Sequence, residues 1–357
     1  MSRFLSRRFD TLEPYVPGEQ PQDMQYIKLN TNESPYPPSP KVFEAINSDE
    51  ITRLRLYPDP IGKKLREKAA KRYDVRPENI FLANGSDEAL AFAFLAFFDN
   101  ERPAAFPDIT YGFYPVYCQL FNIPYVKVPL HGDFSIRCED YYSIGKNIVI
   151  ANPNAPTGLM IPWAEIEKIL GTNPNNVVSI DEAYIDFGGA SVVGLINTYD
   201  NLLVVHTCSK SRSLAGARLS FTFGNEALIS DIDKMRYSFN SYNVNRLTLA
   251  AGEAAIDDEP YYAGMCRKII KTRDRTSVAL QNLGFVMTDS KANFLFARHP
   301  NLSGSALYQK LKARGLLVRH FDKPRISDYL RITIGTDAQM DALLEVLKTI
   351  LAEGNRM

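Results

Sequence analysis

Apolar and polar positions alternate along the first two thirds of the chain in a pattern that separates short strands from helices. Continuous apolar or β-branched runs, which are typical of buried strands, lie at 80–83, 148–151, 177–180, 202–205 and 219–223. Amphipathic stretches such as 61–73 alternate with these runs. The alternation predicts an α/β fold with a mostly parallel sheet and helices on both faces. Ligands of such sheets bind at the carboxyl ends of the strands.

The pattern changes at both ends of the chain. The first 40 residues carry seven prolines and no sustained period, which predicts an extended arm. Towards the other end, a long amphipathic helix is expected at 261–283, followed by strands at 294–297, 316–320 and 329–334 and helices at 303–314 and 337–353. This mixture predicts a small α+β domain. We therefore expect an arm at 1–28, a large ligand-binding domain at 29–258 and a small C-terminal domain at 259–357.

Composition narrows the classes of function. The 357 residues include 41 Lys+Arg and 41 Asp+Glu, so the formal net charge is zero and favours neither nucleic acid nor an anionic membrane as partner. The longest apolar run, 89–98, is half of the roughly 20 residues that cross a bilayer. Four widely spaced cysteines and four histidines show no metal-ligand spacing. We expect a cytoplasmic protein that acts on small molecules without a metal.

Polar residues follow three successive predicted strands at the edge where ligands bind. Asn154 follows the run at 148–151, Asp181 follows 177–180, and Lys210 follows 202–205. A single lysine in such a place is ordinarily a solvent-exposed residue, and an asparagine between two prolines is ordinarily part of a turn. Together, the three residues predict a shared site in which the lysine amine acts as a nucleophile.

These residues stand in motifs that resemble those of the fold-type I pyridoxal-phosphate enzymes, the aminotransferase superfamily. The motifs are Asn152-Pro153 with Pro156-Thr157-Gly158, Asp181-Glu182-Ala183-Tyr184 and Ser209-Lys210, in the same order and at compatible spacing. The resemblance extends over almost the whole chain. It implies that Lys210 forms a Schiff base with pyridoxal 5'-phosphate and that Asp181 holds the pyridine nitrogen protonated. It also implies that Asn154 and Tyr184 bind the phenolic oxygen of the cofactor.

A helix start supplies a candidate site for the phosphate of that cofactor. The strand at 79–83 runs into Asn84-Gly85, and Ser86-Asp87-Glu88 opens an apolar helix, so free N–H groups of Gly85, Ser86 and Asp87 can meet an anion. A capped turn without a ligand is the alternative. The resemblance adds three more cofactor contacts: an arginine for the phosphate, a hydroxyl, and an aromatic ring stacked on the pyridine, namely Arg218, Ser209 and Tyr111.

Within the superfamily, the chain most resembles the histidinol-phosphate aminotransferases, through the segments 12–18, 29–35 and 57–60. That resemblance implies that Tyr15 lines the substrate pocket and that Tyr57 reaches the cofactor phosphate of a neighbouring subunit, which gives a homodimer with shared active sites. Arg319 and Arg331 would bind the anionic groups of the two substrates, and Asn243 would face substrate. Proline-flanked or surface positions are the alternative for the tyrosines and arginines.

Two departures and three rival functions remain at this point. Ser211-Arg212-Ser213 follows the lysine where small and aromatic residues are common, and Leu56 stands where a basic residue is usual. An aromatic-amino-acid aminotransferase and a threonine-phosphate decarboxylase share many of the same motifs. A non-catalytic regulator would normally carry a DNA-binding domain ahead of the cofactor domain, whereas only about 28 residues precede Leu29. The expected activity is amino transfer between L-glutamate and imidazole acetol phosphate, which yields 2-oxoglutarate and L-histidinol phosphate in histidine biosynthesis.

Overall fold

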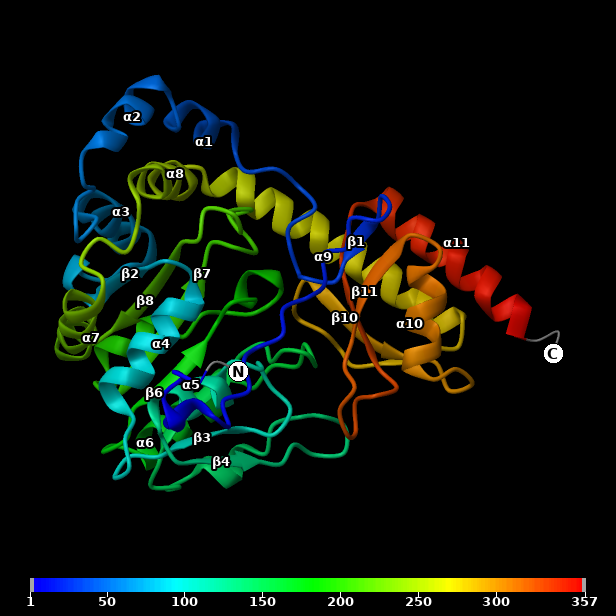
Figure 1. Ribbon diagram of the computed structural model, residues 1–357, viewed down its shortest axis with the longest axis horizontal. Coiled ribbons are helices and arrows are strands. Elements are labelled where there is room, and N and C mark those ends of the chain that lie inside the picture. The colour runs from blue at the N-terminus through cyan, green and yellow to red at the C-terminus, as the bar shows by residue number, and fades with distance from the viewer. Residues whose placement is uncertain (1–2, 355–357) are drawn as a thin grey trace.

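The protein is built around a seven-stranded sheet, seen in a computed structural model that describes residues 3–354 (Figure 1). The strand order is β2-β8-β7-β6-β5-β3-β4, and β8 alone runs antiparallel to its neighbours. In chain order the strands are β2 (Ile80–Ala83), β3 (Ala104–Pro107), β4 (Tyr125–Val128), β5 (Asn147–Ala151), β6 (Val178–Asp181), β7 (Leu202–Thr207) and β8 (Ser220–Gly224). The predicted mostly parallel sheet is therefore confirmed.

Helices cover both faces of this sheet because the central strands are apolar on both sides. Residues such as Ile180 and Val204 face one hydrophobic cluster, and Val149 and Val205 face the other. The first cluster includes side chains of α3 (Lys63–Tyr73), α6 (Trp163–Thr172) and α8 (Arg246–Ile256). The second includes side chains of α4 (Ser86–Phe97), α5 (Tyr114–Phe121) and α7 (Glu226–Phe239). Burial on both faces explains why these strands read as continuous apolar runs.

A second sheet of five strands lies at the other side of the molecule (Figure 1). Its order is β1 (Ile27–Leu29), β11 (Leu316–His320), β12 (Leu330–Thr333), β10 (Phe294–Arg298) and β9 (Val286–Met287). Two helices accompany it, α10 (Gly304–Lys312) and α11 (Asp337–Gly354), and the long helix α9 (Glu259–Asn282) leads into it from the large sheet. Strand β1 comes from the expected arm and pairs in parallel with β11, so the N-terminal segment is part of the small sheet.

Short helices complete the chain. They are η1 (Arg7–Phe9), α1 (Pro40–Ala45), α2 (Ser48–Thr52), η2 (Arg53–Arg55), η3 (Pro77–Asn79), η4 (Cys138–Tyr141), η5 (Ile185–Phe187) and η6 (Val193–Asn197). Within residues 3–354, every helix is either too short or too polar to cross a lipid bilayer.

Candidate active site

A cavity of about 360 Å³ lies at the carboxyl ends of the central strands, between the large sheet, the N-terminal segment and the small sheet. That volume falls in the range of small-molecule pockets. Most of the predicted site residues line it, namely Tyr15, Ser86, Asp87, Tyr111, Asp181, Tyr184, Ser209, Lys210, Arg218, Arg319 and Arg331. Four basic and three acidic side chains line the cavity; the acidic ones are Asp87, Asp181 and Glu33. The balance favours anionic ligands.

Lys210 stands three residues after the end of β7, with its amine in the cavity. Its Nζ donates a hydrogen bond of 3.1 Å to the carbonyl oxygen of Thr31. Burial, followed by the charge of Arg331, lowers the pKa of the Lys210 amine to about 8. An amine with such a pKa loses its proton near neutral pH far more readily than an ordinary lysine, as a nucleophile or proton carrier requires.

Asp181 is the last residue of β6 and is 5% exposed. Its carboxylate accepts hydrogen bonds from the Tyr114 hydroxyl at 3.0 Å and from the Ala183 N–H at 3.1 Å. Burial raises the pKa of Asp181 to about 6, although both hydrogen bonds act in the opposite direction. A cation beside this carboxylate would relieve the cost of burying its charge, so the site is suited to a positively charged ring nitrogen.

Tyr184 and Asn154 stand on two different loops that follow strands β6 and β5. The Tyr184 hydroxyl accepts a hydrogen bond of 2.9 Å from Asn32 Nδ2 and lines the cavity, and burial raises its pKa. The buried Asn154 is not among the lining residues. Its amide nitrogen donates to the Ile109 carbonyl at 3.0 Å and to the Thr157 hydroxyl at 3.1 Å, and its oxygen accepts from Thr110 at 2.8 Å. In this structure Asn154 therefore holds the loop at 109–110.

The start of α4 forms an anion cradle with Arg218. Gly85 precedes the helix with φ +82°, and no side chain caps the helix N–H groups. A Cβ at Gly85 would lie 2.4 Å from Arg218 Nη2 and would displace that side chain, and a φ of +82° also favours glycine here. Arg218 also donates to Asp87 at 2.9 Å. Ser209 accepts a hydrogen bond of 2.9 Å from the Thr207 hydroxyl beside this point.

Aromatic rings form one wall of the cavity. The Tyr111 hydroxyl donates to Asp87 at 2.7 Å, and burial raises its pKa well above the ordinary value. The Tyr15 ring stacks on Phe113 with centroids 4.3 Å apart and lies 5.9 Å from the Tyr111 ring. The N-terminal segment thus contributes directly to this wall.

Arg319 and Arg331 line the end of the cavity that belongs to the small sheet. Arg331 Nη2 donates to the Asn30 carbonyl at 2.9 Å, while its buried Nε has no hydrogen-bond partner among the described residues. Arg319 donates to the carbonyls of Val16 and Pro17, both at 3.0 Å. The two guanidinium groups therefore fasten the N-terminal segment and still face the cavity.

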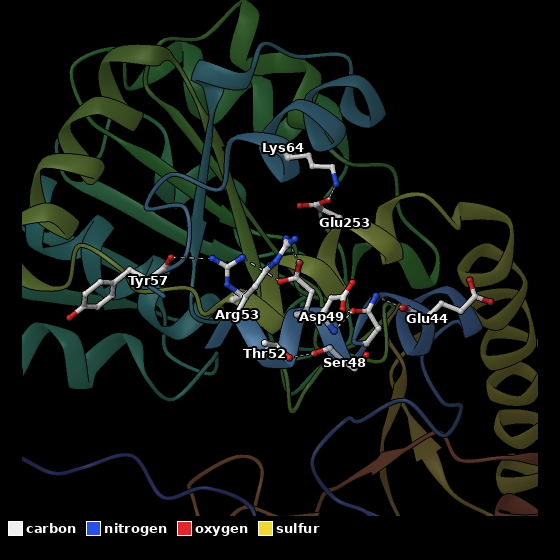
Figure 2. A network of polar contacts seen from close by, with 11 residues as sticks. Glu44, Ser48, Asp49, Thr52, Arg53, Tyr57, Lys64 and Glu253 are labelled. Atoms are coloured by element: carbon white, nitrogen blue, oxygen red, sulfur yellow. Dashed lines mark hydrogen bonds and ion pairs between the residues drawn. The ribbon is translucent and has the colours of Figure 1, made fainter. Parts of the chain in front are cut away.

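Besides Gly85 and Asn154, two more predicted residues, Tyr57 and Asn243, do not line this cavity. Figure 2 shows Tyr57 with its ring pointing away from the polar network of α2. The residue is 78% exposed, and its ring stacks on Tyr242 with centroids 4.5 Å apart. Asn243 is buried, and its Nδ2 donates to the Leu82 carbonyl at 3.1 Å and to Glu88 at 2.6 Å. Within a single chain, neither side chain lines the cavity.

Several residues that support the site were not predicted from the sequence. Tyr114 binds Asp181, Asn32 binds Tyr184, and Thr31 binds Lys210. Tyr114 stands three residues after Tyr111, a spacing that places side chains on one face of a helical turn and could have indicated it. No local signal connects the segment at 31–33 with strand ends that are about 150 or more residues away.

The donor set fits pyridoxal 5'-phosphate. A buried carboxylate suits its ring nitrogen, a buried amine suits its aldehyde, and the glycine-opened helix start with Arg218 suits its phosphate. These groups come from different strand ends and line the same cavity together with Ser86 at the helix start.

Comparison with known proteins gives the same answer over the full chain. The model of the family described as aminotransferase class I and II matches residues 24–347. The histidinol-phosphate aminotransferase of Brachyspira hyodysenteriae is 51% identical over 352 residues, which are 98% of this chain and 99% of that protein. The histidinol-phosphate aminotransferase of a Marinomonas species is 51% identical over 353 residues, which are 98% of this chain and 100% of that protein.

Solved structures agree on the fold. The histidinol-phosphate aminotransferase from Sinorhizobium meliloti in complex with pyridoxal-5'-phosphate superposes with a TM-score of 0.84 at 23% identity, covering 91% of this chain and 92% of that chain. The family match and the full-length relatives add what the fold alone does not show. The chain therefore belongs to the aminotransferase class I and II family of pyridoxal-phosphate-dependent enzymes and, within it, to the histidinol-phosphate aminotransferases.

Proposed function

We propose that this enzyme transfers an amino group between L-glutamate and imidazole acetol phosphate, giving 2-oxoglutarate and L-histidinol phosphate in histidine biosynthesis. The observation that carries the proposal is the convergence of Lys210, Asp181 and Arg218 on one cavity whose other end presents Arg319 and Arg331. Sequence identity of 51% to histidinol-phosphate aminotransferases over nearly the whole chain supports the same substrates.

The large-sheet end would hold the cofactor. The N–H groups at Gly85, Ser86 and Asp87, with Ser209 and Arg218, would bind its phosphate. Asp181 would pair with its ring nitrogen, Tyr184 and Asn154 would bind its phenolic oxygen, and Tyr111 would cover its face. For Asn154 this role requires giving up one of its present hydrogen bonds. Bound pyridoxal phosphate supplies an electron sink that makes the α-hydrogen of an amino acid removable.

Lys210 would carry the proton in both half-reactions. The pKa of its amine, about 8, lets the same group accept a proton from the substrate α-carbon and return one at a second carbon. The hydrogen bond from its Nζ to the Thr31 carbonyl fixes where the amine rests when it is free. Ping-pong kinetics are expected because the two substrates use the same site in turn.

Arg331 and Arg319 would bind the anionic ends of both substrates. Arg331 keeps a buried Nε without a partner among the described residues, which leaves a donor for a carboxylate or phosphate oxygen. A planar fork binds both kinds of oxyanion, so one arginine pair can serve glutamate and the phosphorylated substrate in turn.

We also infer a homodimer with shared active sites, working in the cytoplasm. Exposed apolar side chains gather over residues 43–57, among them Phe43, Ile51, Leu54, Leu56 and Tyr57, and such a patch is typical of an interface. Arg246 donates to the Tyr57 carbonyl at 3.2 Å and so fixes the backbone from which the ring projects. A ring held outside its own cavity suits a role in the site of a partner. The four free, buried cysteines suit a reducing compartment.

The substrate proposal is tested with purified protein, pyridoxal phosphate, glutamate and imidazole acetol phosphate, with products identified by mass. Formation of 2-oxoglutarate and histidinol phosphate supports it. Transfer to phenylpyruvate without transfer to the imidazole phosphate would instead identify an aromatic-amino-acid aminotransferase. Release of carbon dioxide from phosphothreonine would identify the decarboxylase.

The shared site is tested by coexpressing Lys210→Ala chains with Tyr57→Ala chains. In a mixed dimer, one site would contain both substitutions and the other neither. Activity that is absent from each separate variant and returns in the mixture supports sharing. A mixture as inactive as the Lys210→Ala protein contradicts it.

A further inference from the structure

The loop that carries Lys210, residues 208–214, is fastened on the side away from the cavity. Ser211 Oγ donates to Asp186, and Arg212 Nη2 donates to Glu259 at 2.6 Å. Ser213 Oγ donates to Ser34 Oγ at 2.9 Å. Three consecutive residues after the catalytic lysine therefore bind three different segments of the chain.

Two of these contacts close a ring through helix α9. Asp186 lies in η5, two residues after Tyr184, and Glu259 is the first residue of α9. Further along α9, the buried Arg273 donates to the carbonyl of Phe187, the neighbour of Asp186, at 2.8 Å. The lysine loop, the Tyr184 loop and α9 are thus linked pairwise. We call the side chains of Ser211, Asp186, Arg273, Glu259 and Arg212 the polar ring.

Arg212 is a member of the polar ring whose charge is buried. Its side chain is 5% exposed, lies over the Tyr262 ring at 5.1 Å, and has an Nη1 without a partner among the described residues. Burial lowers the pKa of its guanidinium, but Tyr73, Asp186 and Glu259 raise it above the ordinary value, so the group is charged. Such pairs are commonly neutral in stability compared with apolar residues of the same size. The presence of a buried arginine at position 212 is therefore better explained by the segments that it holds in place than by a gain in the stability of the fold.

We propose that Arg212 and Ser211 are positioning residues, which hold the Lys210 loop in fixed register with the Tyr184 loop and with helix α9. This inference rests on the proposed function, because it assigns the residues that place the amine of Lys210 against the reacting atoms. A small misplacement of such an amine lowers the rate of proton transfer more than it lowers substrate binding. The arginine fork suits the task because its direction is fixed by its planarity.

The chain offers a matched control. Arg72 on α3 also donates to Glu259, at 2.9 Å, and among the described residues it makes no hydrogen bond to the Lys210 loop, although its charge acts on Arg212. Arg72→Gln therefore removes an ion pair to the same carboxylate while leaving the polar ring closed. Arg212→Gln opens the ring by removing the charge, and Arg212→Lys retains the charge but not the planar fork.

The experiment measures the affinity of each cofactor-free variant for pyridoxal 5'-phosphate by absorbance, and kcat and KM for glutamate. Arg212→Gln should lower kcat about 10-fold with KM within about twofold, and should weaken cofactor binding about 10-fold. Arg212→Lys should recover part of both losses, and Arg72→Gln should keep all values within about twofold. If Arg212→Gln matches Arg72→Gln, or if KM rises while kcat holds, the proposal is overturned.

Two further outcomes are decisive. If Arg212→Gln does not fold, Ser211→Ala opens the ring without unpairing a buried charge, and a kcat equal to the wild-type value then overturns the proposal. If the wild-type protein binds the cofactor but transfers no amino group from glutamate, the proposed function fails. In that case the role of the polar ring is tested by cofactor affinity alone, and we expect Arg212→Gln to bind pyridoxal 5'-phosphate more weakly than Arg72→Gln does.

Discussion

The two ends of the cavity are built in different ways. At the large-sheet end, Asp181 and Arg218 bind Tyr114 and Asp87, which are side chains of the same sheet and its helices. At the small-sheet end, Arg319 and Arg331 bind backbone carbonyls of the N-terminal segment. Asp181 and Arg218 thus find these partners within one packed unit, and of the described residues at this end only Lys210 and Tyr184 also bind the segment at 31–32. The small-sheet end depends on a chain segment that lies about 300 residues away in sequence.

We infer from this difference that the large-sheet end performs the chemistry and that the small-sheet end recognises the substrate. Groups that must be aligned to a fraction of an ångström stand on strand ends inside a packed core, where side chains have little freedom. Groups that must accept a carboxylate in one half-reaction and a phosphate in the other share their donors with backbone carbonyls of the N-terminal segment. We expect substitutions at the first end to lower kcat and substitutions at the second to raise KM.

The largest effect is expected for Lys210→Ala. Loss of the amine removes the nucleophile and the proton carrier together, so kcat should fall by about 10⁴-fold or more. The visible absorbance of bound cofactor in the native protein should disappear, while the circular dichroism spectrum is unchanged. A variant that retains colour and turnover would show that another amine performs the reaction.

Asp181→Ala comes next. Without the carboxylate the ring nitrogen of the cofactor loses its partner, and kcat should fall by about 10²–10³-fold. Cofactor affinity should fall less, because the phosphate cradle at Gly85 and Arg218 is untouched. Asp181→Glu is the matched control for charge without the same position. If both variants lose only affinity, Asp181 anchors the cofactor without activating it.

At the recognition end, Arg331→Gln should lower kcat/KM for glutamate by about 10–100-fold, chiefly through KM. Arg319→Gln should cost less, about 3–10-fold, because the two terminal nitrogens of Arg319 already bind Pro17 and Val16. Steady-state kinetics with glutamate and with the phosphorylated substrate measure both. Equal losses in kcat at unchanged KM would erase the distinction between the two ends.

The sequence predicts the large-sheet end of the cavity better than it predicts the small-sheet end. The apolar runs before Asp181 and Lys210 predict β6 and β7 to within two residues, because strand, strand end and polar residue are all local in sequence. Strand β1 was not predicted, since three residues carry no measurable period. The hydrogen bonds from Arg319 to Val16 and Pro17 join distant segments, and only the packed chain brings them together.

The bounds and partners of other elements show the same limit. Strands β3 and β4 and helices α5 to α8 were not assigned from the pattern. Asn154 was predicted from its motif, but its three hydrogen bonds to residues at 109, 110 and 157 could not be. Motifs indicate which residues take part, whereas distances require the tertiary fold.

The smallest predicted effect is on thermal stability, because burying the amine of Lys210 at the large-sheet end destabilises the folded protein. In the cofactor-free protein its amine has a pKa of about 8, below the ordinary 10.5, so folding disfavours the charged form. That penalty is present below pH 8 and vanishes as the pH rises towards 10.5. Lys210→Met should therefore melt about 2 °C above wild type at pH 7, with the difference shrinking at pH 10. The exposed Lys271→Met should show no such change. A Lys210→Met advantage of equal size at both pH values would mean that packing, and not charge, opposes the lysine.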